Sequence, residues 1–251
     1  MPTCLARLLE WTQKARDTKE AMEPPVCPHC DALLTSEPKR KTKCKHCGEL
    51  IFVRTRPADG EKTLTTESGA QEIDLQWEQY HAKRILLSRY ADSIVEEAEL
   101  LTEALGALPR DLDVAWSVMF KERQRYLSNR QWGLYRNVTF DMAELLTLDH
   151  RYDTASSYFV DVCTLDLWLH EKLNAESGSR SDPDDALASG VVSRLRACMD
   201  AASLSVVGLS ELIVLRRTQL PMLGRWSRDG NFVAEKVRKA LQMGAPKSGV
   251  P

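Results

Sequence analysis

Between residues 74 and 243, apolar side chains recur every three to four positions, which is the period of an amphipathic α-helix. The connecting segments are short, so we expect neighbouring helices to pack antiparallel. Most aromatic residues of this stretch occupy apolar positions, and we expect them to pack in a core. The spacing predicts helices over residues 74–105, 112–127, 131–148 and 154–174.

A further helix start follows the polar loop that ends near residue 182. Ser181 or Asp182 can accept hydrogen bonds from the first free N–H groups of a helix, and Pro183 fits its first turn. The helical pattern then continues to about residue 217, and we expect a break at Gly190 or Gly208.

Five other segments complete this outline. The nearly all-apolar section 204–215 is expected to be buried, and residues 232–243 form the last predicted helix. Residues 244–251 are expected to be a disordered tail. Residues 1–25 predict a short amphipathic helix that docks on its own domain or on a partner. The polar, turn-rich residues 58–73 are expected to be a linker that can contain one short strand at 63–66.

The two predicted helices on either side of residue 150 carry a more specific pattern. Small side chains let the two helices approach, while Leu146 and Phe159 fill the gap between them. The pattern is similar to one unit of a tetratricopeptide repeat, although the preceding helices do not keep its 34-residue period. We therefore expect an antiparallel helical bundle or a degenerate helical repeat. The matching positions are Ala143, Leu146, Tyr152, Ala155, Phe159 and Val162.

Before residue 58 the chain is organised around two Cys-x-x-Cys pairs that stand 13 residues apart. Cys27, Cys30, Cys44 and Cys47 can bring four thiolates to the corners of a tetrahedron, an arrangement that suits Zn²⁺. Because sulfur fills all four positions, no coordination site remains for a reactive water. The predicted zinc is therefore structural.

Residues 26–57 follow the order pair, strand, pair, strand, which resembles a zinc ribbon. Residues 32–35 and 50–55 are rich in strand formers. Asp31 and Gly48 stand directly after the two cysteine pairs, where a tight turn requires a positive φ. We expect a small N-terminal β domain followed by a mainly α-helical one.

Basic side chains gather in the same segment, where seven Lys or Arg residues stand against three acids. Zn²⁺ with four thiolates contributes two negative charges, so the predicted ribbon is only weakly basic. Such a cluster can contact nucleic-acid phosphates, dock on an acidic protein surface, or keep a small module solvated. The candidate nucleic-acid contacts are Lys39, Arg40, Lys41, Lys43, Arg54 and Arg56.

Composition bears on the compartment more than on the function. The 251 residues carry a formal net charge of −2, so we expect no whole-molecule attraction to nucleic acid or membrane. No apolar run reaches the about 18 residues of a membrane span, and the first residues do not read as a signal peptide. Four of the seven cysteines form the paired motif, which suits a reducing compartment. We predict a cytoplasmic protein.

A catalytic site is the least favoured interpretation. Asp166 and His170 lie four residues apart on one predicted helix and can meet as an acid–base pair, although such pairs are more often surface contacts. The sequence contains no glycine-rich phosphate loop and no His-Glu-x-x-His motif. His29 and His46, inside the cysteine pairs, are expected to be exposed at the tips of the turns.

The run from Cys27 to Pro57 is similar to the ribbon of uncharacterised bacterial and prophage proteins. In those proteins a zinc ribbon precedes a helical region with an Asp-x-x-Trp-Ser segment, and residues 113–117 here read Asp-Val-Ala-Trp-Ser. The resemblance covers roughly residues 25–165. It implies a phage or mobile-element setting and brings no established activity with it.

Three functions agree with these features. The first is a non-catalytic zinc-ribbon adaptor that binds a macromolecular partner, with a protein as the leading candidate. The second is a nucleic-acid-binding or transcription-associated protein that uses the basic side chains of the ribbon on phosphates. The third is an enzyme with a site in the helical domain. The oligomeric state is left open by the sequence.

Overall fold

The computed structural model describes residues 24–178, 181–224 and 226–243. This part of the chain is mainly α-helical, as the sequence predicted, with eight α-helices and a small three-stranded antiparallel sheet. It divides into two compact units between Ile85 and Leu86, which we call the ribbon unit and the helical unit. The tail predicted at 244–251, and all but the last two residues of the helix predicted at 1–25, lie outside the described residues.

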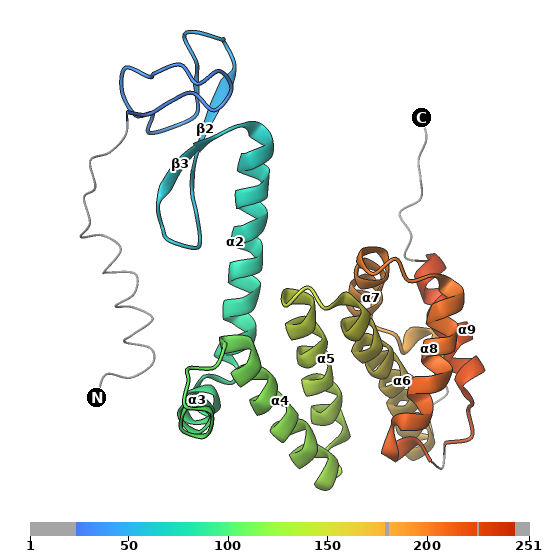
Figure 1. Ribbon diagram of the computed structural model, residues 1–251. Helices are drawn as coiled ribbons and strands as arrows, with labels where there is room; N and C mark the ends of the chain where they lie inside the picture. The colour runs from blue at the N-terminus through green and yellow to red at the C-terminus, as the bar shows by residue number, and fades with distance from the viewer. Residues whose placement is uncertain (1–23, 179–180, 225, 244–251) are drawn as a thin grey trace. The chain divides into compact units, whose positions relative to one another are not determined.

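The sheet of the ribbon unit has the strand order β1–β2–β3, of which Figure 1 labels β2 and β3. β2 (Leu50–Thr55) is the central strand, and its run of β-branched and aromatic residues favours extended backbone. β1 (Thr42–Lys43) and β3 (Lys62–Thr65) pair with its two edges, both antiparallel. β2 is therefore the strand predicted over residues 50–55.

The strand predicted over residues 32–35 does not form. A single isolated bridge joins Val26 to Leu33, and the chain then leaves the pairing. Leu34 packs against the core around the cysteines, but Leu33 is 70% exposed, so the segment buries too little apolar surface to hold a longer strand in place.

Residues 58–73, expected to be a linker, are structured throughout, and the short strand expected at 63–66 forms as β3. Gly60 adopts a φ of +73° in the turn before β3, and Leu64 of this strand packs against the core around the cysteines. α2 (Glu67–Ser88) follows directly, and its start is capped by Thr66, whose hydroxyl accepts a hydrogen bond from the Gly69 N–H at 3.2 Å. The turn-rich composition therefore marks a hairpin turn and a helix cap.

The single helix predicted over residues 74–105 is divided between α2 and α3 (Ala91–Leu105). Arg89 and Tyr90, which lie between them, both donate hydrogen bonds to the carboxylate of Asp141, at 2.5 and 2.7 Å. These bonds hold the chain at the break. The predicted apolar stripe is interrupted there, and its first member, Leu75, is 53% exposed.

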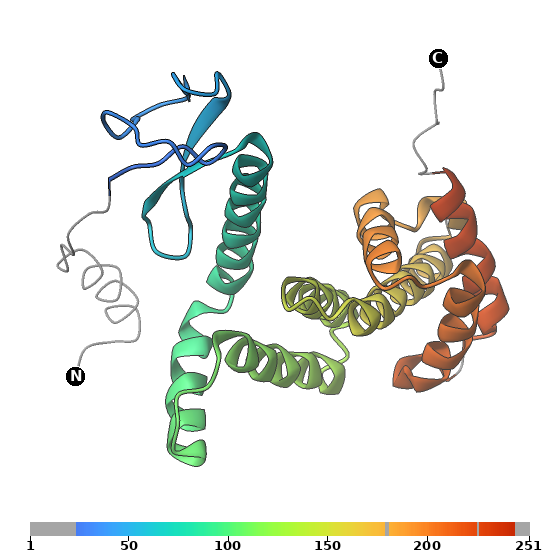
Figure 2. The same cartoon turned by 45° about the horizontal axis from the view of Figure 1, so that its top comes forward.

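The helical unit continues with six further helices, and in it α6 lies between α5 on one side and α7, α8 and α9 on the other (Figure 2). The predictions of helices over 112–127, 131–148, 154–174 and 232–243 are confirmed by α4, α5, α6 and α9. The bounds are α4 (Asp111–Ser128), α5 (Trp132–Leu148), α6 (Tyr152–Ser177), α7 (Ser189–Ala201), α8 (Val206–Gln219) and α9 (Gly230–Met243).

α5 and α6 form the hairpin that carries the repeat-like pattern. Ala143 and Ala155 are fully buried, which allows the two helices to approach closely. Phe159 is also fully buried and meets the ring of Phe140 edge to face, with 5.8 Å between the ring centroids. The side chains of this pattern are therefore core positions of the helical unit.

The C-terminal helices break at a different place from the one predicted. α7 ends before Ala202 and α8 starts after Ser205, whereas Gly190 and Gly208 lie inside the first turns of these helices. Ser203 adopts a φ of +55° in the connection, and the Ser205 hydroxyl accepts a hydrogen bond from the Gly208 N–H at 3.1 Å. The break is therefore set by the capped turn between α7 and α8 and not by either glycine.

The apolar section 204–215 is only partly buried. Leu209 and Ile213 have at most 1% of their surface exposed, but Val207 and Leu215, on the other face of α8, are 69% and 57% exposed. No single helix within the described ranges is long and apolar enough to cross a membrane. α7 and α8 reach that length and composition only when taken together, and the pair is bent by 118° at the break between them.

Asp182 caps a helix start, as predicted, by accepting a hydrogen bond from the Asp184 N–H at 2.9 Å. The helix it starts is the single 3-10 turn η1 (Pro183–Asp185), and α7 begins separately at Ser189.

Candidate metal centre

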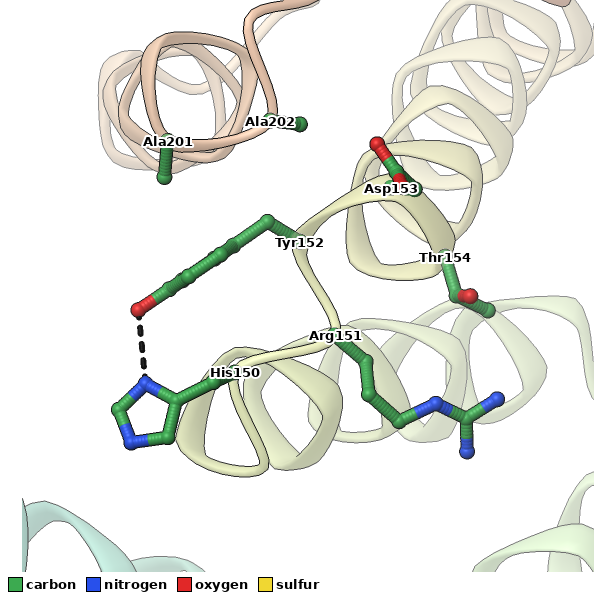
Figure 3. Close-up of a pocket in the computed structure, with 7 residues that line it drawn as sticks. All are labelled: His150, Arg151, Tyr152, Asp153, Thr154, Ala201 and Ala202. Atoms are coloured by element: carbon green, nitrogen blue, oxygen red, sulfur yellow. Dashed lines mark hydrogen bonds between the residues drawn. The ribbon is translucent and has the colours of Figure 1, made fainter.

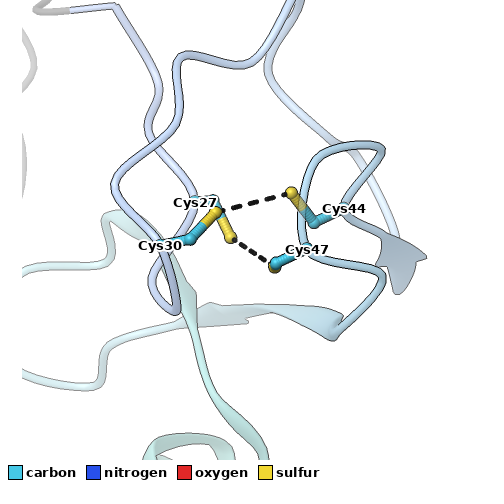
Figure 4. Close-up of side chains that lie close together, drawn as sticks. All are labelled: Cys27, Cys30, Cys44 and Cys47. Atoms are coloured by element: carbon cyan, nitrogen blue, oxygen red, sulfur yellow. Dashed lines mark hydrogen bonds between the residues drawn. The ribbon is translucent and has the colours of Figure 1, made fainter.

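Four cysteine side chains from two turns of the ribbon unit converge on one point (Figure 4). The sulfur atoms of Cys27, Cys30, Cys44 and Cys47 all lie within 4.8 Å of one another. Between the turns, Cys27 Sγ lies 3.8 Å from Cys47 Sγ, and Cys30 Sγ lies 3.9 Å from Cys44 Sγ. A tetrahedral ion with metal–sulfur bonds of about 2.3 Å requires sulfur–sulfur distances of about 3.8 Å. The group can therefore hold one metal ion.

The two cysteine pairs sit in turns with the same hydrogen-bond pattern. The Asp31 N–H donates to the Cys27 carbonyl at 3.0 Å, and the Gly48 N–H donates to the Cys44 carbonyl at 2.9 Å. The first cysteine of each pair also donates its own N–H to the carbonyl five residues further on, at 2.9 and 2.8 Å. Asp31 and Gly48 both have a positive φ, +55° and +79°, as the sequence predicted.

Backbone N–H groups act on the sulfur atoms. Those of Cys47 and His46 lower the pKa of the Cys44 thiol to about 6, and the His46 nitrogen lies 3.4 Å from the sulfur. At Cys30 the Ala32 N–H acts in the same direction, but burial and the neighbouring thiols outweigh it and raise the pKa to about 12. The thiols therefore do not ionise together on their own, and a bound cation has to displace the remaining protons.

Few apolar residues support this centre. The buried cluster around it consists of Cys27, Cys44 and Ile51, with Leu34 and Leu64 packed against it. The histidines of both turns are exposed, as expected. His29 Nε2 also lies 3.0 Å from the Leu50 carbonyl oxygen, which links the first turn to β2.

The first half of α2 completes the ribbon unit. Ala70 and Ile73 are buried at 2% and 8% exposure, and Trp77 Nε1 donates a hydrogen bond to the Thr55 carbonyl at 2.6 Å. Asp74, on the same face of the helix, accepts hydrogen bonds from Arg54. The sequence predicted this helix only from residue 74, because the polar residues before it favoured a linker.

Two of the six predicted nucleic-acid contacts are already paired with acids. Arg54 donates to both carboxylate oxygens of Asp74, at 2.8 and 3.1 Å. Arg56 lies 2.6 Å from Asp59 and 2.9 Å from Glu61. The charges of these two arginines are therefore largely neutralised within the ribbon unit.

The other four predicted contacts lie on or near β1. Lys41 sits over the ring of Phe52, with its Nζ 4.3 Å from the centroid. Lys39, Arg40 and Lys43 are exposed, and no acid lies within ion-pair distance of them in the part of the chain that the structure describes. These three residues keep free charges toward solvent.

The candidate acid–base pair of α6 does not assemble. Arg136 donates to both carboxylate oxygens of Asp166, at 2.6 and 2.8 Å. His170 Nε2 instead lies 3.1 Å from the hydroxyl of Ser181. Asp166 therefore belongs to an ion pair with α5, and His170 fastens the loop that follows α6.

A buried charged cluster in the helical unit was missed by sequence reasoning. Asp161 has no exposed surface and accepts a hydrogen bond from Arg216 Nε at 2.9 Å. Arg123 lies 3.7 Å from the same carboxylate and 4.9 Å from the ring centroid of Tyr135. Asp161 and Arg216 are 55 residues apart, so no local pattern signals their meeting.

The turn between α5 and α6 borders an open hollow of about 500 Å³ in the helical unit. His150 and Tyr152 point toward one another across a 2.8 Å hydrogen bond, and Arg151 extends on the other side of the turn (Figure 3). Ala201 and Ala202, from the end of α7, complete the lining. The hollow opens to solvent and its lining is mostly polar, unlike the enclosed apolar pockets of small-molecule sites.

Comparison with known proteins assigns the chain to no family. No protein-family model matches it, and no curated protein or solved structure shows significant similarity to it. The resemblance to bacterial and prophage ribbon proteins therefore stays a prediction, and the function has to be argued from the geometry of the chain.

Proposed function

We propose that this protein is a non-catalytic zinc-ribbon adaptor. In this proposal a structural Zn²⁺ holds the ribbon unit together, and the protein binds a macromolecular partner, in first place another protein. The observation that carries the proposal is the four-sulfur site, with cross-pair sulfur distances of 3.8 and 3.9 Å.

The donor set supports zinc as the ion. Four thiolates in a tetrahedron favour Zn²⁺ or an iron–sulfur centre among common biological metals, and Zn²⁺ is the one without redox chemistry. A complete set of sulfur ligands leaves the ion no position for water or substrate, so its task is to hold the fold. A reducing compartment such as the cytoplasm suits this site because it keeps the four thiols from forming disulfides.

Exposed apolar side chains on the helical unit favour a protein partner. Leu105 and Leu108, where α3 passes into the turn before α4, are 65% and 78% exposed. Val207 and Leu215 on α8 are similarly exposed. Groups of large apolar side chains on a surface are typical of contact sites between proteins.

Affinity purification with quantitative mass spectrometry, after nuclease treatment of the lysate, tests the adaptor. We expect a protein that co-purifies with the wild type and is absent from the Leu105→Glu/Leu108→Glu variant. Leu173→Glu, at a 62% exposed position of α6, is the matched control and should retain it. X-ray absorption of the purified protein tests the metal, and zinc with four sulfur neighbours is expected. An oxygen ligand at the zinc, or capture that depends entirely on nucleic acid, would contradict the proposal.

A second candidate function, nucleic-acid binding, is favoured by the free charges of Lys39, Arg40 and Lys43. If these residues contact phosphates, replacing all three by alanine weakens binding. The slope of log affinity against log salt then falls by about 0.7 to 0.9 for each phosphate that is no longer neutralised. Arg54→Ala/Arg56→Ala is the matched control and should change the slope less, because acids already pair with both arginines. Equal slopes in the wild type and the triple variant would rule this function out.

A further inference from the structure

The face of α2 that rests on the ribbon continues beyond it. Side chains three and four positions apart share one face of a helix, and Ala70, Ile73 and Trp77 form such a row. The Trp77 indole is held in place by its 2.6 Å hydrogen bond to the Thr55 carbonyl, near the end of β2. Beyond this point the same row runs on without the sheet to cover it.

The next residues of the row are aromatic and exposed. Tyr80 is 44% exposed, and His81 beside it is exposed as well. The Trp77 ring stacks on His81 with 5.4 Å between centroids and meets Tyr80 edge to face at 5.5 Å. We call these three residues the aromatic step. Because Trp77 anchors the other two rings, the step is a preformed surface of flat side chains.

Two exposed cationic residues of the ribbon unit are candidates for phosphate contacts beside the aromatic step. Lys62 of β3 is directly opposite Thr55 in the sheet register, and Thr55 is the residue whose carbonyl holds Trp77. Arg84 follows Tyr80 and His81 in the same row of α2. Both are exposed, and neither has an acid within ion-pair distance among the residues described here. Two acids of α2 border the same face, since Asp74 lies three positions before Trp77 and Glu78 three positions before His81. Asp74 is already paired with Arg54.

We infer that the aromatic step binds a single-stranded nucleic acid, with bases stacked on Tyr80 and His81 and phosphates at Lys62 and Arg84. This inference rests on the second candidate function and locates its base contacts. Unpaired bases offer the flat faces that exposed aromatic side chains stack on, and stacking does not depend on base identity. Within a duplex these faces are hidden, whereas an apolar peptide would leave the two cations without a role.

Fluorescence anisotropy with labelled 12-residue oligo(dT) and oligo(U) tests the inference on the full-length, zinc-loaded protein. We expect Tyr80→Ala/His81→Ala to weaken binding of the strand it prefers by at least about tenfold, since each of two stacked bases contributes about fivefold or more. Tyr80→Phe keeps the ring and should retain binding within about twofold. Gln79→Ala, an exposed position on the opposite face of α2, is the matched control. Comparing the two strands shows whether the ligand is DNA or RNA.

Several outcomes would overturn the inference. Duplex DNA or RNA bound as tightly as the single strand would exclude base stacking. If the double alanine variant binds like the wild type while the Lys39, Arg40 and Lys43 substitutions lower the salt slope, the second candidate function stands and the aromatic step has no part in it. If the wild type binds no strand even at low salt, both fail. Circular dichroism and zinc content of each variant show that the fold is kept.

Discussion

The ribbon unit and the helical unit are each stabilised in a different way. Around the metal centre, three residues are buried in one cluster, and two of them are cysteine ligands. In the helical unit, the largest cluster holds nineteen buried residues from five helices. Burying a full-sized apolar side chain contributes about 1.5 to 3 kcal/mol, so the second cluster can support its own fold and the first cannot. In a unit with so small a core, a metal ion held by the four cysteines would supply the missing stability.

The largest expected effect comes from removing one ligand. Cys44→Ala should abolish metal binding and unfold β1 to β3, because a structural zinc contributes about 10 to 16 kcal/mol. The helices from α4 onward should keep their circular dichroism signal and their amide protection. Metal content and hydrogen exchange measured by mass spectrometry check both parts. Cys198→Ala, which removes a buried cysteine outside the site, is the control and should leave the zinc bound. Loss of protection throughout both units would break the comparison.

The next effect tests the helical unit alone. Asp161→Ala leaves Arg216 and Arg123 without the carboxylate between them, and an uncompensated buried charge costs about 3 to 5 kcal/mol. Denaturant unfolding followed at the helical signal measures this loss, while the zinc affinity should not change. Asp153→Ala removes an exposed acid from the same helix and should have little effect. A reduced zinc affinity in Asp161→Ala would show that the two units are coupled.

A smaller effect is expected at the contact between α8 and α9. A methyl group added at Gly230 would lie 2.8 Å from the Cα of Val214, so Gly230→Ala has to push the helices apart. The expected cost is about 1 to 3 kcal/mol. Gly133→Ala in α5 meets open space and should be neutral or stabilising by up to about 1 kcal/mol. Thermal unfolding of the two variants measures the difference, and equal melting temperatures would show that α9 moves freely.

Mild acid should destabilise the ribbon unit and leave the helical unit unchanged or more stable. As the pH falls from about 7 to 5, protons compete with the metal for the thiolates, and the ribbon unit loses its ion. Burial raises the pKa of Asp141 and of Asp166 above the ordinary value, so the folded helical unit binds protons more readily than the unfolded chain. Each such proton adds up to about 1.4 kcal/mol per pH unit to the free energy of unfolding while the pH lies between the unfolded and folded pKa values.

A zinc indicator and the helical signal, read in the same titration, check this opposite response. Release of the metal with an unchanged or higher melting temperature of the helices is the expected result. Helices that melt at a higher pH than the one at which zinc leaves would contradict it.

The parts of this molecule that the sequence predicted are those set by local spacing. The group of four cysteines that can hold a metal follows from the two cysteine pairs, and α4, α5, α6 and α9 follow from the helical period. The break before α3 could not be predicted, because the residue that holds it, Asp141, is about 50 positions away. For the same reason the positive charges of the ribbon could be read from the sequence, but the pairing of Arg54 with Asp74 could not. An apolar pattern also does not tell which of its residues stay exposed, as Val207 does.

The segment that joins the two cysteine turns can vary in sequence more than the turns themselves. Residues 35–41 provide no sulfur ligand and belong to no strand of the sheet. Their length and charge can therefore change without moving the four cysteines that can hold an ion. This is where the ribbon could acquire a new binding preference while its fold is inherited unchanged.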